Sequence, residues 1–183
     1  MKRLFIAIHI IQSEELKDAF QLLKESLSGE RIKWVEDENL HLTIQFIGEV
    51  EEYIVPVIVE KLNTISPKQK IEFTIEGIGL LRNMSDPRVI YAGIKQIRGL
   101  MELRNEVESC LLNADILNER TKFMPHLTLG RIKFLKNKHI MEDILTDLRD
   151  TYFQKNICSE FILFESHLTP GGPVYKKIKA YSI

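Results

Sequence analysis

The alternation of apolar and polar residues divides the chain into strands and amphipathic helices. An apolar run from Leu4 to Ile10 and strict alternation from Ile71 to Ile78 are typical of β-strands. Ser13 is a residue type that caps helices, and Leu16, Ala19, Phe20, Leu23 and Leu27 follow it at helical spacing. Further patterns predict strands at 32–35, 40–47, 88–94, 159–165 and 175–182, a helix beginning near residue 56, and helices at 97–113 and 138–149. The order of these elements predicts an α+β protein.

Two of the predicted strands begin with the same motif, His-Leu-Thr followed by an aliphatic residue. The copies are His41-Leu42-Thr43-Ile44 and His126-Leu127-Thr128-Leu129. Residues two apart in a strand point to the same face, so each copy presents an imidazole and a hydroxyl together while its leucine faces a core. A helix and further strands follow each copy. This repeat predicts two similar lobes, each with a mainly antiparallel sheet packed against helices, whose motif strands line one shared cleft.

A third copy, His167-Leu168-Thr169, precedes Pro170-Gly171-Gly172-Pro173. That composition favours a turn over a strand. We therefore expect His167 and Thr169 to lack the extended backbone that would align them, and His167 not to be catalytic. His9 lies alone at the end of the first predicted strand, where a histidine is more often structural or exposed than catalytic.

The composition is that of an ordinary globular protein. With 183 residues and 44% hydrophobic content, the chain suits one domain, residues 1–183, made of two lobes. No apolar run approaches the ~18 residues of a membrane span, and the opening Lys2-Arg3 leads into a strand rather than a signal peptide. Cys110 and Cys158 have neither metal-binding nor redox spacing. We expect a cytoplasmic monomer with no membrane partner.

The net charge of -1 conceals an uneven distribution. Residues 1–60 carry six Lys and Arg against twelve Asp and Glu, whereas residues 61–183 carry nineteen against fourteen. The segment from Arg120 to Lys138 has six basic residues and no acidic one, and it contains the second motif. This segment is either a solvated basic face or a surface for an anionic substrate. A charge suited to general nucleic-acid binding is absent.

Three kinds of chemistry could use the two motifs. A metal site is short of ligands, because no cysteine or carboxylate accompanies the histidines at ligand spacing. Nucleophilic attack by a threonine would need a base aimed at its hydroxyl, yet His and Thr lie side by side on each strand. General acid-base catalysis needs only one neutral and one protonated imidazole, with hydroxyls that donate to an anionic oxygen. Arg131 follows the second motif and either neutralises a phosphate or faces solvent.

The motifs and their flanking residues resemble the 2H phosphoesterases, and among them the RNA 2',3'-cyclic phosphodiesterases, also described as 2'-5' RNA ligases. The resemblance extends over nearly the whole chain. Besides both motifs it rests on Arg3-Leu4-Phe5-Ile6-Ala7-Ile8, Lys33-Trp34-Val35, Arg88-Val89-Ile90-Tyr91 and Gly172-Pro173-Val174-Tyr175. The chain departs from the family pattern at Phe164, where a tyrosine is common.

The resemblance implies a bilobal, pseudo-two-fold α+β fold that needs no metal or other cofactor. It also implies that His41 and Thr43 pair with His126 and Thr128, and that RNA ends with a 2',3'-cyclic phosphate are hydrolysed to 2'-phosphates. We expect His41 and His126 to be catalytic, and Thr43, Thr128 and Arg131 to bind the substrate. In this assignment His126 is the base toward water and His41 is the acid toward the 3'-oxygen. The alternatives are ligation through a 2'-5' linkage at the same site, and an RNA-end-binding protein without turnover.

Overall fold

The computed structural model describes residues 1–65, 70–119, 122–170 and 172–183. The strands in this part of the chain are β1 (Lys2–His9), β2 (Arg31–Trp34), β3 (His41–Val50), β4 (Ile71–Leu81), β5 (Val89–Lys95), β6 (His126–Phe134), β7 (Tyr152–Cys158), β8 (Glu160–Thr169) and β9 (Gly172–Ser182). The α-helices are α1 (Glu14–Ser26), α2 (Val55–Leu62), α3 (Arg98–Leu112) and α4 (Lys138–Asp147). Two 3-10 turns, Asp37–Asn39 and Glu52–Ile54, precede β3 and α2.

The strand order is symmetric about the two motif strands. Across the described residues it reads β7-β4-β5-β6-β3-β1-β8-β9, with β2 added beside β6, and the registers of the paired strands are antiparallel. The antiparallel α+β prediction is thus confirmed. Two separate sheets were expected, however, and the halves are hydrogen-bonded into one, because β3 and β6 meet through the pair Leu42 and Leu127. These leucines are equivalent positions of the repeat, so the pseudo-two-fold axis passes between them.

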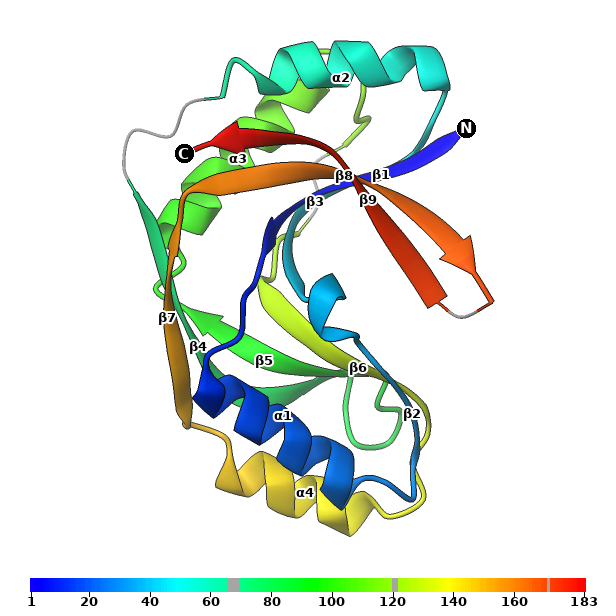
Figure 1. Ribbon diagram of the computed structural model, residues 1–183, viewed down its shortest axis with the longest axis vertical. Helices are drawn as coiled ribbons and strands as arrows, with labels where there is room; N and C mark the ends of the chain where they lie inside the picture. Colours follow the sequence, from blue (N-terminus) through cyan, green and yellow to red (C-terminus); the bar gives the residue numbers. More distant parts are fainter. Residues whose placement is uncertain (66–69, 120–121, 171) are drawn as a thin grey trace.

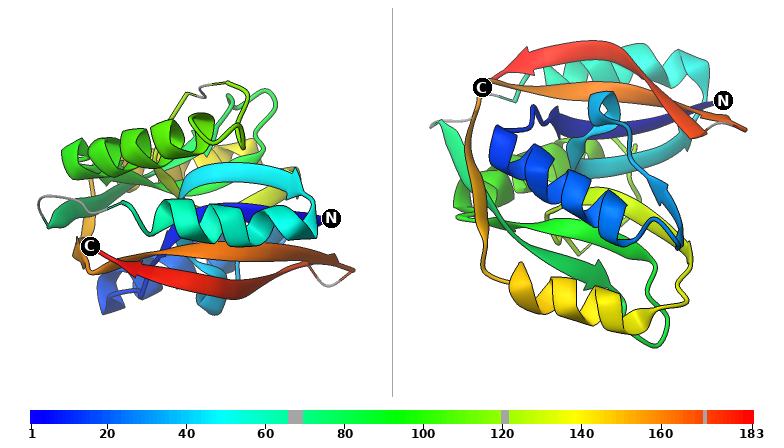
Figure 2. Two further views of the ribbon diagram at one scale, coloured as in Figure 1. Left: turned by 90° about the horizontal axis from the view of Figure 1, so that it is seen from above. Right: turned by 60° about the horizontal axis from the view of Figure 1, so that its bottom comes forward.

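The helices lie at the two ends of the molecule, with the strands between them (Figures 1 and 2). Helices α1 and α4 lie at one end, where α1 packs on β7 and α4 on β4. At the other end α2 packs on α3, and α3 contacts both β3 and β4. The apolar faces of these elements form one continuous buried cluster that includes both motif leucines. One shared core therefore supports the two motif strands.

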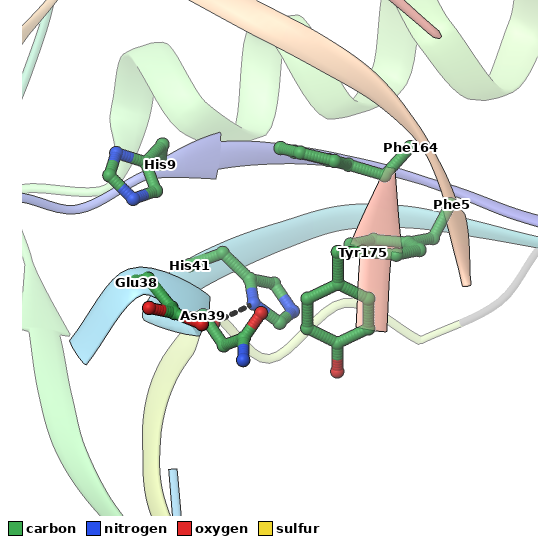
Figure 3. A pocket seen from close by; sticks show the side chains of 7 residues that line it. All are labelled: Phe5, His9, Glu38, Asn39, His41, Phe164 and Tyr175. Carbon is green, nitrogen blue, oxygen red and sulfur yellow. Dashed lines mark hydrogen bonds between the residues drawn. The ribbon is translucent and has the colours of Figure 1, made fainter. Parts of the chain in front are cut away.

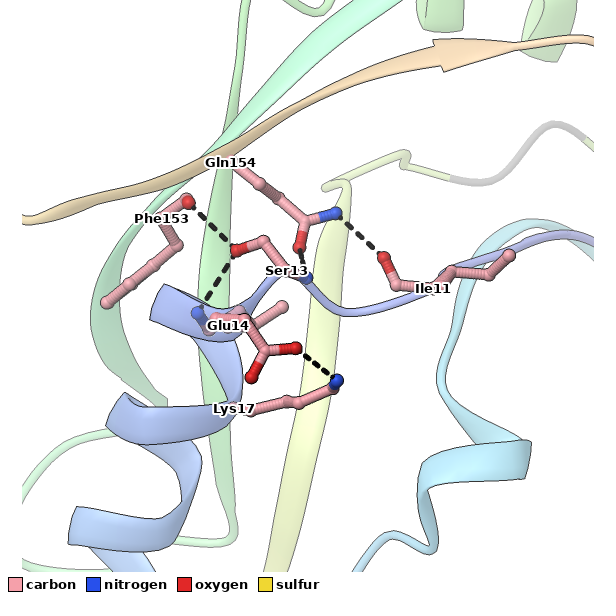
Figure 4. Close-up of polar contacts among 7 residues, drawn as sticks. Ile11, Ser13, Glu14, Lys17, Phe153 and Gln154 are labelled. Atoms are coloured by element: carbon pink, nitrogen blue, oxygen red, sulfur yellow. Dashed lines mark hydrogen bonds and ion pairs between the residues drawn. The ribbon is translucent and has the colours of Figure 1, made fainter.

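The N-cap of α1 ties that helix to an edge strand that the hydrophobic pattern did not predict (Figure 4). The Ser13 hydroxyl accepts a hydrogen bond from the Leu16 amide (3.2 Å) and donates one to the Phe153 carbonyl on β7 (3.1 Å). Gln154 is buried and its side-chain amide donates to the Ile11 carbonyl (3.1 Å), while its side-chain oxygen accepts from the Ser13 amide (2.7 Å). These polar contacts add to the pairing of β7 with β4 and to the burial of Phe153 and Cys158, and the burial pattern of β7 is too irregular to predict a strand.

Trp34 is partly buried and packs against the core, and Gly130 of the second motif strand leaves space for its ring. A Cβ atom at Gly130 would lie 2.8 Å from the Trp34 ring and 2.9 Å from the Ile32 side chain. The indole also packs edge-on to Phe20, with ring centroids 5.7 Å apart. A close approach of this kind is a common reason for glycine inside a strand. Trp34 is therefore part of the support beneath β6.

Candidate active site

The two motif strands start with the same pattern of burial. In both, the leucine is fully buried, whereas the histidine and threonine are half-buried on the opposite face. Because Leu42 and Leu127 are the paired residues and both point into the core, the side chains on either side of them, of His41, Thr43, His126 and Thr128, point to the opposite face. The four side chains named by the sequence are thereby brought to one face at the centre of the sheet.

Each motif histidine is held by the same backbone hydrogen bond. His41 Nδ1 lies 2.6 Å from the carbonyl oxygen of Asn39, and His126 Nδ1 lies 2.9 Å from that of Met124. In both cases the carbonyl belongs to the residue two positions earlier. A carbonyl oxygen only accepts, so Nδ1 must carry a proton in each ring. The tautomer of both neutral imidazoles is then fixed, and Nε2 is the atom available for acid-base work.

His41 lies in an aromatic enclosure (Figure 3). Its ring centroid is 5.1 Å from that of Phe5 and 5.1 Å from that of Tyr175, which meets it edge-on at 83°. Phe164 stacks on Phe5 at 5.2 Å. A recess beside these rings is lined by Phe5, His9, Glu38, Asn39, His41, Phe164 and Tyr175.

The enclosure changes the protonation of His41. Burial lowers the pKa of His41 below its ordinary value, and the hydrogen bond to the Asn39 carbonyl only partly opposes this. The positive charge of Arg131 and those of His9 and His126 lower the pKa of His41 further. His9 is exposed and lies directly opposite His41 in the β1–β3 register. His9 is thus exposed, which agrees with the sequence analysis, and it also lies next to His41.

His126 has a different neighbour. The ring of Tyr91, on β5, meets it edge-on at a centroid distance of 5.7 Å and an angle of 69°. Tyr91 lies opposite Thr128 in the β5–β6 register. The corresponding place in the first repeat, opposite Thr43 on β1, is taken by Ala7. Each histidine therefore contacts a tyrosine, and each tyrosine follows the other copy of the motif in the sequence.

Basic side chains lie close to His41 and Tyr175. Arg131 is exposed on β6, and its charge acts on both His41 and Tyr175. Burial raises the pKa of Tyr175, and the charges of Arg131 and Arg3 oppose that rise. Arg131 is thus near enough to the aromatic enclosure to act on an anion bound beside His41. Arg120, at the start of the basic segment, lies outside the described residues.

The third copy of the motif has a different backbone from the one expected. His167 and Thr169 belong to strand β8 and not to a turn, because β8 and β9 form a hairpin that extends to its very tip. His167 Nε2 lies 3.3 Å from the buried carboxylate of Glu165. Side chains alternate along a strand, so this pair faces away from Phe164 and from the recess beside His41. His167 is therefore separated from His41 because it lies on the other face of the sheet. That His167 is not catalytic stays a prediction.

Neither a metal cluster nor a membrane helix is found in the described part of the chain. No group of three or more His, Cys, Asp or Glu side chains in it could hold a metal ion. Among the same residues no helix is long and apolar enough to cross a membrane.

The chain belongs to the LigT-like phosphoesterase family. The family model, described as LigT like Phosphoesterase, matches twice, at residues 10–91 and 94–175. Each match contains one motif, His41 in the first and His126 in the second. The internal repeat inferred from the two strands is thus present at the level of the family.

Relatives and solved structures cover essentially the whole chain. An RNA 2',3'-cyclic phosphodiesterase of Methanocaldococcus jannaschii is 36% identical over 98% of this chain and 99% of its own length. One of Archaeoglobus fulgidus is 33% identical over 98% of this chain and 99% of its own length. The crystal structure of TT0787 of Thermus thermophilus superposes with a TM-score of 0.79 at 25% identity, covering 98% of this chain and 97% of that one. Escherichia coli LigT complexed with 3'-AMP shares the fold, with a TM-score of 0.72 at 22% identity over 100% of this chain and 97% of that one.

The motifs did not reveal the residues that surround the histidines. Tyr91 and Tyr175 follow His41 and His126 by 50 and 49 residues, but this spacing does not show that each ring contacts the histidine of the other copy. Asn39 and Met124 contribute carbonyl oxygens, for which the residue type is irrelevant. The shared offset of two residues before each histidine is the only sequence signal for that hydrogen bond.

Proposed function

We propose that the protein is an RNA 2',3'-cyclic phosphodiesterase that hydrolyses cyclic-phosphate RNA ends to 2'-phosphates by metal-independent acid-base catalysis. The observation that carries the proposal is the matched pair of imidazoles. Each has its Nδ1 bound to a backbone carbonyl and its Nε2 left for the substrate, on strands that meet at Leu42 and Leu127. The names of the relatives with 36% and 33% identity support the same substrate class.

The chemistry needs two proton transfers on opposite sides of one phosphorus. His126 removes a proton from a water molecule, whose oxygen attacks phosphorus as the bond from phosphorus to the 3'-oxygen breaks. His41 donates a proton to that departing oxygen, and the phosphate remains on the 2'-oxygen. Thr43 and Thr128 donate hydrogen bonds to the non-bridging oxygens, and Arg131 offsets their negative charge.

This order of roles requires His41 to carry a proton despite its lowered pKa. A bound cyclic phosphate brings a negative charge next to the imidazole, and an opposite charge at short range favours the protonated form. We therefore infer that His41 is mainly neutral in the free enzyme and takes up its proton when the substrate binds. Substrate binding would then convert His41 into the protonated form that acts as the general acid.

The test is the product formed from a short RNA with a 2',3'-cyclic phosphate, incubated with the protein in chelator. We expect the 2'-phosphate. His41→Ala and His126→Ala should each lower kcat by about 100-fold or more, and the double variant should lose little beyond the worse single one. His139→Ala is the matched control, because His139 is an exposed histidine on α4.

The other outcomes identify the alternatives. RNA joined through a 2'-5' linkage would identify a ligase using the same groups in reverse. Tight binding of the RNA end without turnover would identify a binding protein. A 3'-phosphate product would contradict the proposed leaving group. We further propose that the enzyme acts in the cytoplasm as a monomer without a cofactor, with residues 1–183 as one two-lobed domain.

A further inference from the structure

We propose that Tyr91 is a positioning residue for His126, and that Gly79 is required because it leaves room for the Tyr91 ring. The inference rests on the proposed function, since it assigns His126 an orientation that matters for catalysis. It concerns residues on β4 and β5 that neither motif contains.

Three side-chain positions form a row across three neighbouring strands. Gly79 on β4 is opposite Tyr91 on β5, and Tyr91 is opposite Thr128 on β6. Residues directly opposite each other in an antiparallel pair project to the same face, so all three share the face that carries His126. Tyr91 is half-buried there, while its neighbours Ile90 and Ala92 point into the core.

The Tyr91 ring contacts the imidazole of His126 and occupies the space where a side chain at residue 79 would lie. A Cβ atom at Gly79 would come within 2.5 Å of Tyr91 Cζ, 2.6 Å of Oη and 2.9 Å of Cε1. Real Cβ atoms essentially never make contacts this short, so a side chain at residue 79 would force the ring to move. Gly79 does not have a positive φ, so its backbone conformation does not call for glycine. The glycine is explained by space alone.

The ring supplies a constraint that the backbone hydrogen bond lacks. The bond from Nδ1 to the Met124 carbonyl fixes the tautomer of His126 but leaves the imidazole free to tilt about that contact. An edge-to-face aromatic contact at 5.7 Å limits this tilt and thereby directs Nε2. In the first repeat Ala7 stands where Tyr91 would be, and Tyr175 of β9 contacts His41 instead. Tyr91 thus serves the second histidine only.

The experiment compares one variant that lacks the Tyr91 ring, Tyr91→Leu, with another that displaces it, Gly79→Ala. Tyr91→Leu should lower kcat on the cyclic-phosphate RNA by about tenfold or more with little change in KM, because misplacement of a reacting group costs rate rather than binding. Tyr91→Phe keeps the ring and should retain most of kcat. Gly79→Ala should lower kcat in the same sense. Tyr53→Leu is the matched control, since Tyr53 is 74% exposed and outside the site.

A double variant tests whether the methyl group acts through the ring. In the Tyr91→Leu background, Gly79→Ala should have no further effect on kcat, because the atoms that it would contact are gone. If Gly79→Ala costs as much in that background as in the parent enzyme, the proposal is wrong. It is equally wrong if Tyr91→Leu retains the parent kcat.

A spectroscopic readout separates this inference from the proposed function. The Cε1 proton of His126 experiences the ring current of Tyr91, so its NMR signal should shift in Tyr91→Leu and in Gly79→Ala, whereas the His41 signal should stay in place. Unchanged His126 signals in folded variants would refute the positioning contact whatever the enzyme does. Absence of turnover by the parent protein would refute the proposed function and leave the NMR result to decide the contact.

Discussion

The pair of leucines that joins the two halves of the sheet offers a direct test of how the fold serves the site. Leu42 and Leu127 are both 0% exposed, and their pair is the contact in register between β3 and β6. Leu127→Ala removes three buried carbon atoms, a change expected to lower the free energy of unfolding by about 2–5 kcal/mol. At about 2–4 °C per kcal/mol, the melting temperature should fall by about 4–20 °C.

The same change should lower activity by more than the loss of stability explains. Leu127 follows His126 in the sequence and is paired with Leu42, which follows His41. A cavity at this pair would let the two motif strands shift relative to each other. We expect kcat to fall by about tenfold when it is measured well below the melting temperature, where the variant is fully folded. Leu23→Ala is the matched control, because Leu23 is also 0% exposed but lies on α1.

The assay is hydrolysis of a cyclic-phosphate RNA under saturating substrate, with the melting temperature of each variant measured in the same buffer. Leu23→Ala should lose stability by a comparable amount and keep its kcat. If Leu127→Ala also keeps its kcat, the contact between the halves does not set the distance between the histidines. The shared sheet would then not be what positions both groups.

Further predictions concern the chemistry of the site. Excess EDTA should leave hydrolysis unchanged; activity that is lost with chelator and restored by Zn or Mn would show that the histidines are ligands. Both pH profiles should be bell-shaped, and the optimum of kcat should lie at higher pH than that of kcat/KM, because burial lowers the pKa of His41 in the free enzyme and the bound phosphate raises it; coincident optima would contradict this. Thr43→Ala and Thr128→Ala should each cost about tenfold in kcat, less than loss of either histidine. His167→Ala should retain the parent rate, and damage equal to that of His126→Ala would mean that another copy of the motif is catalytic.

The repeated tripeptide was sufficient to predict which strands lie together, for a simple physical reason. Alternation in a strand fixes the face on which a side chain lies, and two equal strands around a pseudo-two-fold axis bring equal faces together. The sequence therefore placed Leu42 and Leu127 in the core and the motif histidines on the other side. It could not show that the two sheets are joined into one, because a hydrogen-bonded register between distant segments leaves no local pattern.

Other features escaped prediction because polar residues are buried. Gln154 on β7 is 7% exposed, and its side chain bonds to the backbone near Ser13. On α3, Arg104 and Glu108 form an ion pair of 2.6 Å with both side chains almost fully buried, although charged residue types would by themselves suggest a surface position. The prediction that His167 lies in a turn was wrong for a different reason. Proline and glycine mark the tip of the β8–β9 hairpin, but the strand continues right up to it.

The two motif copies are alike, but the residues around them differ. Two equal strands supply two equal imidazoles, whereas in-line displacement needs one with a proton and one without. The motifs themselves differ in the residue five positions after the histidine, which is Phe46 in the first copy and Arg131 in the second.

The residues on the strands next to β3 and β6 also differ between the two copies. Phe46 lies opposite Phe5, while Arg131 lies opposite Val89, and the β8–β9 hairpin adds Tyr175 to the first side alone. His41 therefore contacts the rings of Phe5 and Tyr175, whereas His126 contacts the single ring of Tyr91 and lies on the strand that carries Arg131. Because the duplicated strands fix where the groups are, and because burial and the charge of Arg131 lower the pKa of His41, exchanging Phe46 and Arg131 should shift the pH optimum of kcat/KM while the far-UV circular dichroism spectrum stays unchanged.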